Sequence, residues 1–256
     1  MKIITYNVNG LRAGTTKGLP EWLAENNPDV VCIQETKLQP EQYPAEAYEE
    51  LGYKAYFHSA VKKGYSGVAI LTRIEPDHVE YGMGIEAYDY EGRFMRADFG
   101  DLSVVSVYHP SGTTGDVRQD FKMEWLEAFQ NYIDELKKER PNLVLCGDYN
   151  ICHEEIDIHD PVRSVKYSGF LPEEREWMTQ FLSTGFTDAF RHFYPETQKF
   201  TWWSYRFKAR ANNKGWRIDY CMVSDQIKDR MLEAWIDNDA VHSDHCPTGV
   251  RIKIEE

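Results

Sequence analysis

The sequence predicts one layered α/β or α+β domain over residues 1–256, in which helices cover buried β-sheets. Strand-like apolar runs recur along the chain, and several contain an uninterrupted apolar stretch, as expected when both faces of a strand are covered. Helical patterns lie between these runs. No Gly/Ser linker, low-complexity tract or repeat divides the chain, and its 42% hydrophobic content can supply a large core.

The apolar runs predict eight strands, over residues 2–7, 30–34, 67–72, 94–99, 102–108, 143–146, 218–223 and 248–254. Three segments have helical character. Residues 20–26 begin with Pro20, which suits a first helical turn. Residues 116–140 place apolar side chains at three- and four-residue spacing. Residues 172–183 carry Glu173 and Glu174 early, where negative charge favours a helix N-terminus.

The net charge of −13 argues against a protein that coats nucleic acid without specificity. Residues 199–218 differ from the rest, because they hold six Lys or Arg, six aromatic residues and no Asp or Glu. Such a basic and aromatic segment is compatible with specific nucleic-acid binding, and an ordinary basic hairpin is the alternative.

The five cysteines are odd in number and form no CxxC pair, so buried free thiols in a reducing compartment are expected. No segment approaches the ~20 apolar residues that span a bilayer. The first residues, "MKIITYNVNG", lack the features of a signal peptide. We therefore expect a cytoplasmic protein, nucleoid-associated in a bacterium, without a membrane partner and monomeric by default.

Polar side chains follow several of the predicted strands. They are Asn7 and Asn9 after the first, Glu35 after "VVCIQ", Tyr108 after "LSVVSV", and Asp148 and Asn150 after "LVLCG". Near the C-terminus, Asp219 lies within an apolar run, and Asp244 and His245 precede the last strand. Polar groups gathered where strands end indicate a functional site at a sheet edge.

Each group also has a structural alternative. Asn9 and Asp148 stand beside glycines and could serve turns, and Glu35 could cap the following segment. Asp219 is harder to explain in this way, because a buried carboxylate needs a partner, and His245 would be a suitable one. In combination, these carboxylates, amides and an Asp–His pair suit metal-assisted attack of water on a phosphate ester. HExxH and GxxxxGK[ST] motifs are absent, which disfavours zinc-peptidase and P-loop chemistry.

Ordered segments along nearly the whole chain resemble the exonuclease III family of abasic-site (AP) endonucleases, in the endonuclease/exonuclease/phosphatase superfamily. These segments include "KIITYNVNGLRA" (2–13), "PDVVCIQETKL" (28–38), "CGDYNICHEEIDIHDP" (146–161), "FTWWSY" (200–205), "GWRIDY" (215–220) and "HSDHCP" (242–247). The resemblance implies a DNase I-like, four-layer αββα sandwich of two packed sheets flanked by helices. It also implies hydrolysis, dependent on Mg²⁺ with Mn²⁺ as a substitute, of duplex DNA 5′ to an abasic site. The product is a 3′-hydroxyl, and 3′→5′ exonuclease and 3′-phosphodiesterase activities are expected beside it.

The resemblance also assigns roles to the polar residues. Glu35 resembles the principal metal ligand, with Asn7, Asn9 and Asp244 near the metal. Asp148 resembles the group that orients and deprotonates the attacking water, and Asn150 the group that holds it, both beside the metal. His245 is expected to contact the scissile phosphate next to the metal, held by Asp219. Tyr108 resembles a phosphate or leaving-group contact.

In the basic segment, Trp202 and Trp216 resemble the walls of a pocket that receives a flipped abasic deoxyribose; core packing is the alternative for Trp202. Arg206, Lys208, Arg210 and Lys214 are expected to lie against DNA phosphates.

The chain departs from the family pattern at Asn9, where some members have Asp, and at Ser111, where relatives often have Asn or Gln. The loop 111–121 also differs. The rival readings are a DNase I-like nuclease or a phosphoinositide phosphatase of the same superfamily, and a non-catalytic DNA-damage-binding module. The last would lack at least one of Glu35, Asp148, Asp219 and His245, and all four are present.

Overall fold

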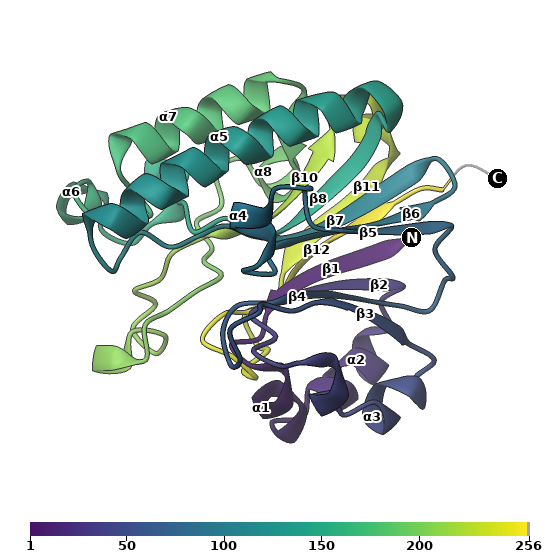
Figure 1. Cartoon of the computed structure of the whole chain (residues 1–256). Coiled ribbons are helices and arrows are strands. Elements are labelled where there is room, and N and C mark those ends of the chain that lie inside the picture. The colour runs from purple at the N-terminus through teal and green to yellow at the C-terminus, as the bar shows by residue number, and fades with distance from the viewer. Residues whose placement is uncertain (255–256) are drawn as a thin grey trace.

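The structure, a computed structural model, describes residues 1–254 and consists of four layers (Figure 1). Two six-stranded mixed sheets pack against each other, and helices cover their outer faces (Figure 1). This arrangement confirms the αββα sandwich that the resemblance implies. No helix within residues 1–254 has the length and apolar character required to cross a membrane.

Each sheet contains one central parallel pair, and its other strands are antiparallel. The first sheet has the order β11 (Met231–Ile236), β12 (Thr248–Ile252), β1 (Lys2–Asn7), β2 (Val30–Gln34), β4 (Val68–Thr72) and β3 (Lys54–His58). The second has the order β5 (His78–Tyr81), β6 (Phe94–Phe99), β7 (Leu102–Tyr108), β8 (Asn142–Asp148), β10 (Asp219–Ser224) and β9 (Phe186–Asp188).

The α-helices are α1 (Leu11–Thr16), α2 (Leu19–Asn26), α3 (Glu46–Glu49), α4 (Glu86–Asp89), α5 (Asp116–Glu139), α6 (Pro161–Ser164), α7 (Pro172–Ser183) and α8 (Ala189–Phe193). Short 3₁₀ turns are η1 (Pro40–Gln42), η2 (Glu155–Asp157), η3 (Arg206–Lys208) and η4 (Asp225–Arg230). Helices α1 to α3 lie outside the first sheet, and α5 and α7 run side by side over the second (Figure 1). The three predicted helices are confirmed as α2, α5 and α7, with ends that agree to within one residue.

All eight predicted strands are present, and four of them have the predicted bounds: β1, β2, β6 and β7. Strands β3, β5, β9 and β11, the four edge strands of the two sheets, were not predicted. An edge strand has a neighbouring strand on one side only and is less buried, so its sequence need not contain a continuous apolar run. The burial of β5 illustrates this, since none of its four residues is fully buried.

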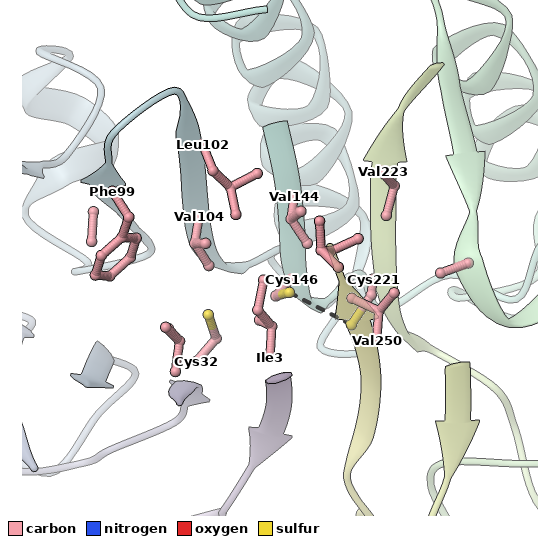
Figure 2. Close-up of a cluster of buried hydrophobic side chains, with 14 of the residues drawn as sticks. Ile3, Cys32, Phe99, Leu102, Val104, Val144, Cys146, Cys221, Val223 and Val250 are labelled. Carbon is pink, nitrogen blue, oxygen red and sulfur yellow. Dashed lines mark hydrogen bonds between the residues drawn. The ribbon is translucent and has the colours of Figure 1, made fainter. Parts of the chain in front are cut away.

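The largest apolar cluster lies between the two sheets, where their facing side chains meet (Figure 2). Ile3 and Val250 from the first sheet pack with Val104, Val144 and Val223 from the second. All five cysteines are buried free thiols, as expected, and Cys146 and Cys221 face each other within this cluster (Figure 2). Two further clusters join each sheet to its helices, which completes the four layers.

The topology brings the ends of the central strands to one edge. In each parallel pair, β1 with β2 and β7 with β8, both strands end on the same side. Strands β10 and β12 run antiparallel to β8 and β1, so they begin on that side. Gly147, the glycine beside Asp148, lies inside β8 and not in a turn. The alternative that Asp148 serves a turn at this glycine is therefore wrong. A Cβ there would lie 1.9 Å from the carbonyl oxygen of Val107, so only glycine lets β7 and β8 approach so closely.

Candidate active site

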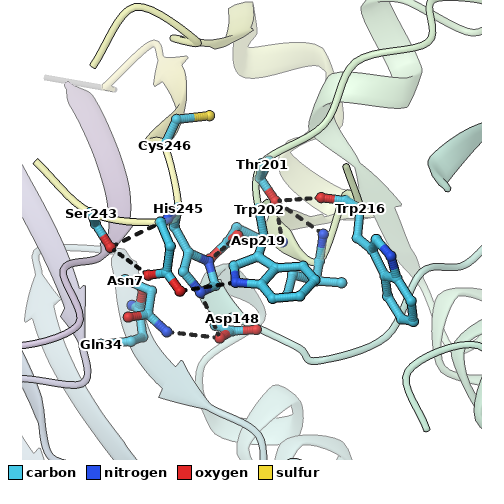
Figure 3. A network of polar contacts seen from close by, with 12 residues as sticks. Asn7, Gln34, Asp148, Thr201, Trp202, Trp216, Asp219, Ser243, His245 and Cys246 are labelled. Atoms are coloured by element: carbon cyan, nitrogen blue, oxygen red, sulfur yellow. Dashed lines mark hydrogen bonds and ion pairs between the residues drawn. The ribbon is translucent and has the colours of Figure 1, made fainter. Parts of the chain in front are cut away.

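Asp148 occupies the centre of the strand edge where the predicted site residues meet (Figure 3). Its Cα is paired across the second sheet with Tyr108 of β7 on one side and with Asp219 of β10 on the other. From the first sheet, the side-chain amide of Asn7 donates to the Asp148 carboxylate at 2.8 Å (Figure 3). The two sheets therefore contribute to one site, as the sequence pattern indicated.

His245 and Asp219 form the predicted buried pair. The Nδ1–H of His245 donates to the Asp219 carboxylate at 2.8 Å, and its Nε2 lies 3.9 Å from Asp148 Oδ2. Burial alone favours the neutral ring, but the Asp219 carboxylate, aided by Asp148, raises the pKa of His245 to about 10. At neutral pH the site thus contains an imidazolium whose Nε2–H points toward Asp148.

Asp148 is 1% exposed, and its pKa lies well above the ordinary value for an aspartate. Burial, together with the neighbouring Asp219 carboxylate, raises its pKa to about 7, although His245 opposes this shift. A group with a pKa near the working pH is well suited to accept a proton during catalysis. The backbone amide of Asn150 donates to Asp148 Oδ1 at 2.8 Å, so the carboxylate is also held in place from its own strand end.

Glu35, Asp148 and His245 each offer a ligand atom, and these atoms lie within 4.8 Å of one another. Burial disfavours the charged form of Glu35, but the Lys37 ammonium at 2.8 Å and the Asn7 amide at 2.9 Å lower its pKa. Two carboxylates and no thiolate make a donor set that suits a hard cation such as Mg²⁺. The predicted contact of His245 with a phosphate beside the ion stays a prediction.

The two asparagines of the first strand end are bound to protein groups. The Asn7 amide nitrogen bridges Glu35 and Asp148, and its oxygen accepts from the backbone of Asn9. Asn9 donates to Asp244 at 3.0 Å and accepts from Lys37. Both side-chain amides thus lie among the charged groups of the site, and their predicted place beside the metal stays a prediction.

Asp244 connects the strand edge to the aromatic segment. Its carboxylate accepts from the indole N–H of Trp202 at 3.1 Å, as well as from Asn9. Burial favours the neutral acid, but His245 and these donors lower the pKa of Asp244. Trp202 is also bridged, backbone to backbone, to Trp216 and to His245. The Trp202 ring is thereby fixed beside the carboxylates and is not core packing alone.

A cavity of about 430 Å³ opens directly beside these carboxylates. Trp202 and Trp216 line it, with ring centroids 6.0 Å apart and planes nearly perpendicular. Tyr167 and the Ser168–Gly169 backbone form another part of its wall, and Glu35, Asp148 and His245 line its inner side. Tyr108, Asn150 and Asp244 also face it. The structure therefore brings the predicted pocket residues and the predicted catalytic residues to one cavity.

The predicted basic residues do not share one environment. Arg206 and Lys208 lie in η3, and they and Lys214 are exposed. Arg210 instead packs over Trp203, and its guanidinium donates to the carbonyl oxygens of Ser243, Asn238 and Ala240. These bonds argue against the phosphate contact predicted for Arg210. They tie the basic segment to the loop that carries Asp244.

Lys37 is a site residue that the sequence analysis missed. It lies two residues after Glu35 and contacts both Glu35 and Asn9. Glu35, Lys37 and Asn150 all have φ near +52°, in the left-handed region that non-glycine residues rarely adopt. Such strain, of order 1–3 kcal/mol per residue, accumulates at functional sites. The available sequence signal was only the closeness of a lysine to a glutamate that directly follows an apolar strand.

A comparison with known proteins agrees with this geometry. The model of the Endonuclease/Exonuclease/phosphatase family matches residues 4–245. An exodeoxyribonuclease of Bacillus subtilis (strain 168) is 44% identical over 256 residues, which cover 99% of this chain and 100% of the relative. The DNA repair nuclease APEX1 of Danio rerio is 43% identical over 96% of this chain and 80% of its own length. Among solved structures, an AP endonuclease from Archaeoglobus fulgidus has a TM-score of 0.91 and 31% identity, covering 99% of this chain and 100% of that one. The chain therefore belongs to the Endonuclease/Exonuclease/phosphatase family.

Proposed function

We propose that the protein is a Mg²⁺-dependent AP endonuclease, which hydrolyses the phosphodiester 5′ to an abasic site in duplex DNA and leaves a 3′-hydroxyl. One observation carries the proposal. The aromatic-walled cavity opens onto the Glu35, Asp148 and His245 cluster, so a sugar in the cavity places its phosphate at the polar groups. Relatives named as a nuclease of DNA repair and as an AP endonuclease support the same substrate class.

The cavity explains how base loss could be recognised. Trp202 and Trp216 meet nearly edge to face and present apolar surfaces to whatever enters. A deoxyribose without a base can be turned out of the helix at little cost, since no pairing or stacking holds it. The shape between the two rings, and not a hydrogen bond to a base, is then the selective feature.

Glu35 and Asp148 would hold the metal ion. When bound, Mg²⁺ supplies positive charge that offsets the negative charge accumulating on the phosphate. Lys37 and Asn7 keep Glu35 ionised and correctly placed for this task. Mn²⁺ has similar ligand preferences and is expected to substitute.

Asp148 and Asn150 prepare the nucleophile. The carboxylate of Asp148 accepts a proton from the attacking water. Asn150 lines the cavity, and its amide nitrogen donates to the carbonyl oxygen of His109, which fixes the side chain. Its amide oxygen then orients the water against the phosphorus.

His245, Tyr108 and Asp244 act on the phosphate and the leaving group. The Nε2–H of His245 donates to a non-bridging oxygen, and Asp219 keeps the ring protonated and oriented. Burial and the nearby Glu35 raise the pKa of Tyr108 well above its ordinary value, so its phenol is a donor at neutral pH. Asp244 stands beside the departing 3′-oxygen. The same groups serve 3′→5′ exonuclease and 3′-phosphodiesterase reactions when a 3′ end occupies the cavity.

The segment 199–214 projects from the sandwich (Figure 1), and its Trp202 lines the cavity. This segment carries the DNA contacts that we propose. Phe207 is 93% exposed, has a left-handed backbone, and stands between Arg206 and Lys208. Apolar side chains between cations insert between base steps and kink a duplex. We assign Phe207 this wedge role, with Arg206 and Lys208 against phosphates. The acidic remainder of the surface limits binding to undamaged duplex.

We further propose that the enzyme acts as a monomer in a reducing, cytoplasmic compartment, where its five buried thiols stay free.

The test is cleavage of a 5′-labelled duplex that carries one tetrahydrofuran abasic analogue, with an intact duplex alongside, in Mg²⁺. The analogue cannot undergo β-elimination, so a cut immediately 5′ to it must be hydrolytic. Rapid cutting there, with the intact duplex spared or trimmed only from its 3′ end, is expected. Hydrolysis of intact duplex or of an inositol phosphate in preference to the analogue would contradict the proposal.

A further inference from the structure

Two charged residues lie on the buried faces of the helices that cover the second sheet. Along α5, Lys122 begins the stripe that continues through Trp125 and Phe129, and along α7, Glu174 begins the stripe that continues through Trp177. The side chains of Lys122 and Glu174 are 1% and 0% exposed, and they form an ion pair with a 2.5 Å separation. Helices α5 and α7 run side by side, which brings the two stripes together (Figure 1).

Lys122 also reaches the turn that follows β8. Its Nζ donates to the main-chain carbonyl oxygen of Asn150 at 2.9 Å. Asn150 has φ +51°, and its backbone N–H donates to the carboxylate of Asp148. The lysine thus holds a strained turn that carries both groups assigned to the attacking water.

Glu174 reaches a second, neighbouring segment of the cavity wall. Its carboxylate accepts from the backbone amides of Gly169 at 2.6 Å and Leu171 at 3.0 Å, and from the hydroxyl of Ser168 at 3.2 Å. Gly169 packs so closely on Trp216 that a Cβ there would lie 2.7 Å from the ring. The glutamate therefore fixes the wall segment that supports Trp216.

We propose that the Lys122–Glu174 pair is a positioning device, which sets the Asp148–Asn150 turn against the Ser168–Gly169 wall of the cavity. The inference rests on the proposed function and extends it to residues outside the cavity. A buried ion pair is weak evidence for stability, because apolar side chains of similar volume often serve as well. Here, however, each partner is bonded to a different segment of the cavity wall, Lys122 to Asn150 and Glu174 to Gly169. Alignment of a bound sugar with the nucleophile depends on how these two adjoining segments are set against each other.

The experiment replaces the pair by a neutral one, Lys122→Met with Glu174→Gln. No charge is left unpaired, and the glutamine oxygen can still accept from Gly169, so the double variant is expected to fold. We expect kcat on the tetrahydrofuran duplex to fall about 100-fold, the effect of a misplacement near 1 Å. KM and the Mg²⁺ concentration for half-maximal rate are expected to change much less than kcat, because both indole walls of the cavity and Glu35 are retained.

The matched control is Arg96→Met with Asp98→Asn. This ion pair, at 3.0 Å, is also well buried, and it lies near the β6–β7 turn, at the opposite end of β6 and β7 from Tyr108. It is expected to alter the melting temperature but not kcat. An unchanged kcat in a folded Lys122→Met, Glu174→Gln variant, a rise in KM alone, or an equal loss of kcat in the control would overturn the proposal.

The wild-type enzyme is measured first on the same duplex. Failure of the wild type to cut at the analogue would count against the proposed function itself. In that case, kcat of the wild type and of the double variant is compared for removal of nucleotides from a 3′ end. The same loss of about 100-fold is expected there, so the positioning role is judged separately from cleavage at abasic sites.

Discussion

The indole N–H of Trp202 donates to the carboxylate of Asp244 at 3.1 Å, and this bond joins the aromatic wall of the cavity to the charged strand edge. Asp244 in turn accepts from Asn9, Asn9 accepts from Lys37, and Lys37 pairs with Glu35. A wall residue is thereby connected through hydrogen bonds to the proposed metal ligand. This connection makes Trp202 and Trp216 unequal, although both line the same cavity.

Trp202→Phe should reduce kcat/KM on abasic duplex more than Trp216→Phe does. Both changes keep an aromatic wall, but only the first removes a donor to a carboxylate, a bond worth about 1.5–3 kcal/mol. We expect a loss of about 10-fold or more for Trp202→Phe, the equivalent of 1.4 kcal/mol. Steady-state kinetics on the tetrahydrofuran duplex measure the difference. Equal losses in the two variants would remove the special role of the Trp202–Asp244 bond.

Asp148→Asn should lower kcat on the same duplex by about 10²- to 10⁴-fold, as expected for loss of a general base. The amide preserves the shape of the side chain, so fluorescence anisotropy should still detect binding to the abasic duplex. Normal turnover in this variant would remove Asp148 from the mechanism.

The same Asp148→Asn change should stabilise the metal-free protein above pH 7. In the folded state the pKa of Asp148 is raised from 3.8 to about 7 by burial and by Asp219. Between pH 3.8 and about pH 7, Asp148 is ionised in the unfolded state but still protonated in the folded state. The free energy of unfolding therefore falls as the pH rises through that window. Asparagine does not titrate and removes this fall. Denaturant unfolding in a chelator at pH 4 and at pH 8 tests the sign, and a variant less stable than wild type at pH 8 would contradict it.

Glu35→Gln should raise the Mg²⁺ concentration needed for half-maximal turnover, because a charged oxygen ligand becomes neutral. It also leaves Lys37 without its ion-pair partner at 2.8 Å. Titration of Mg²⁺ into chelator-treated enzyme, followed both by turnover and by calorimetry without DNA, measures the change. Chelation alone should abolish turnover in the wild type, and an unaltered Mg²⁺ titration in the variant would place the ion elsewhere.

Phe207→Ala should weaken binding to abasic duplex while leaving thermal stability unchanged, because the ring is 93% exposed. Stacking of one base on an aromatic ring is worth about 1–3 kcal/mol. Leu232→Ala is the matched control, since Leu232 is 56% exposed on β11, near the opposite end of that strand from the site. Anisotropy titrations compare the two, and equal affinities would mean that Phe207 does not touch DNA.

The central strands and the chemistry of their ends are predictable from the amino-acid sequence alone. Strands such as β2 and β4 are buried on both faces, so each forms a continuous apolar run that is visible without a partner. Asp219 inside such a run signalled a buried carboxylate in need of a cation. The edge strands β3, β5, β9 and β11 contain no such apolar run, because a strand with a neighbour on one side only is less buried. Their strand structure depends on the sheet that they join.

The partners of the polar side chains, in contrast, depend on contacts between segments that are distant in the sequence. Asn7 and Asn9 appeared as possible ligands, yet their amides are bonded to neighbouring side chains and backbone. Arg210 appeared as a phosphate contact, yet its guanidinium is bound to three carbonyl oxygens. Lys122 looked like one lysine in a long amphipathic helix, yet it is buried against Glu174. Residue type fixes which bonds a side chain can make, whereas the packing of distant segments fixes which of those bonds it does make.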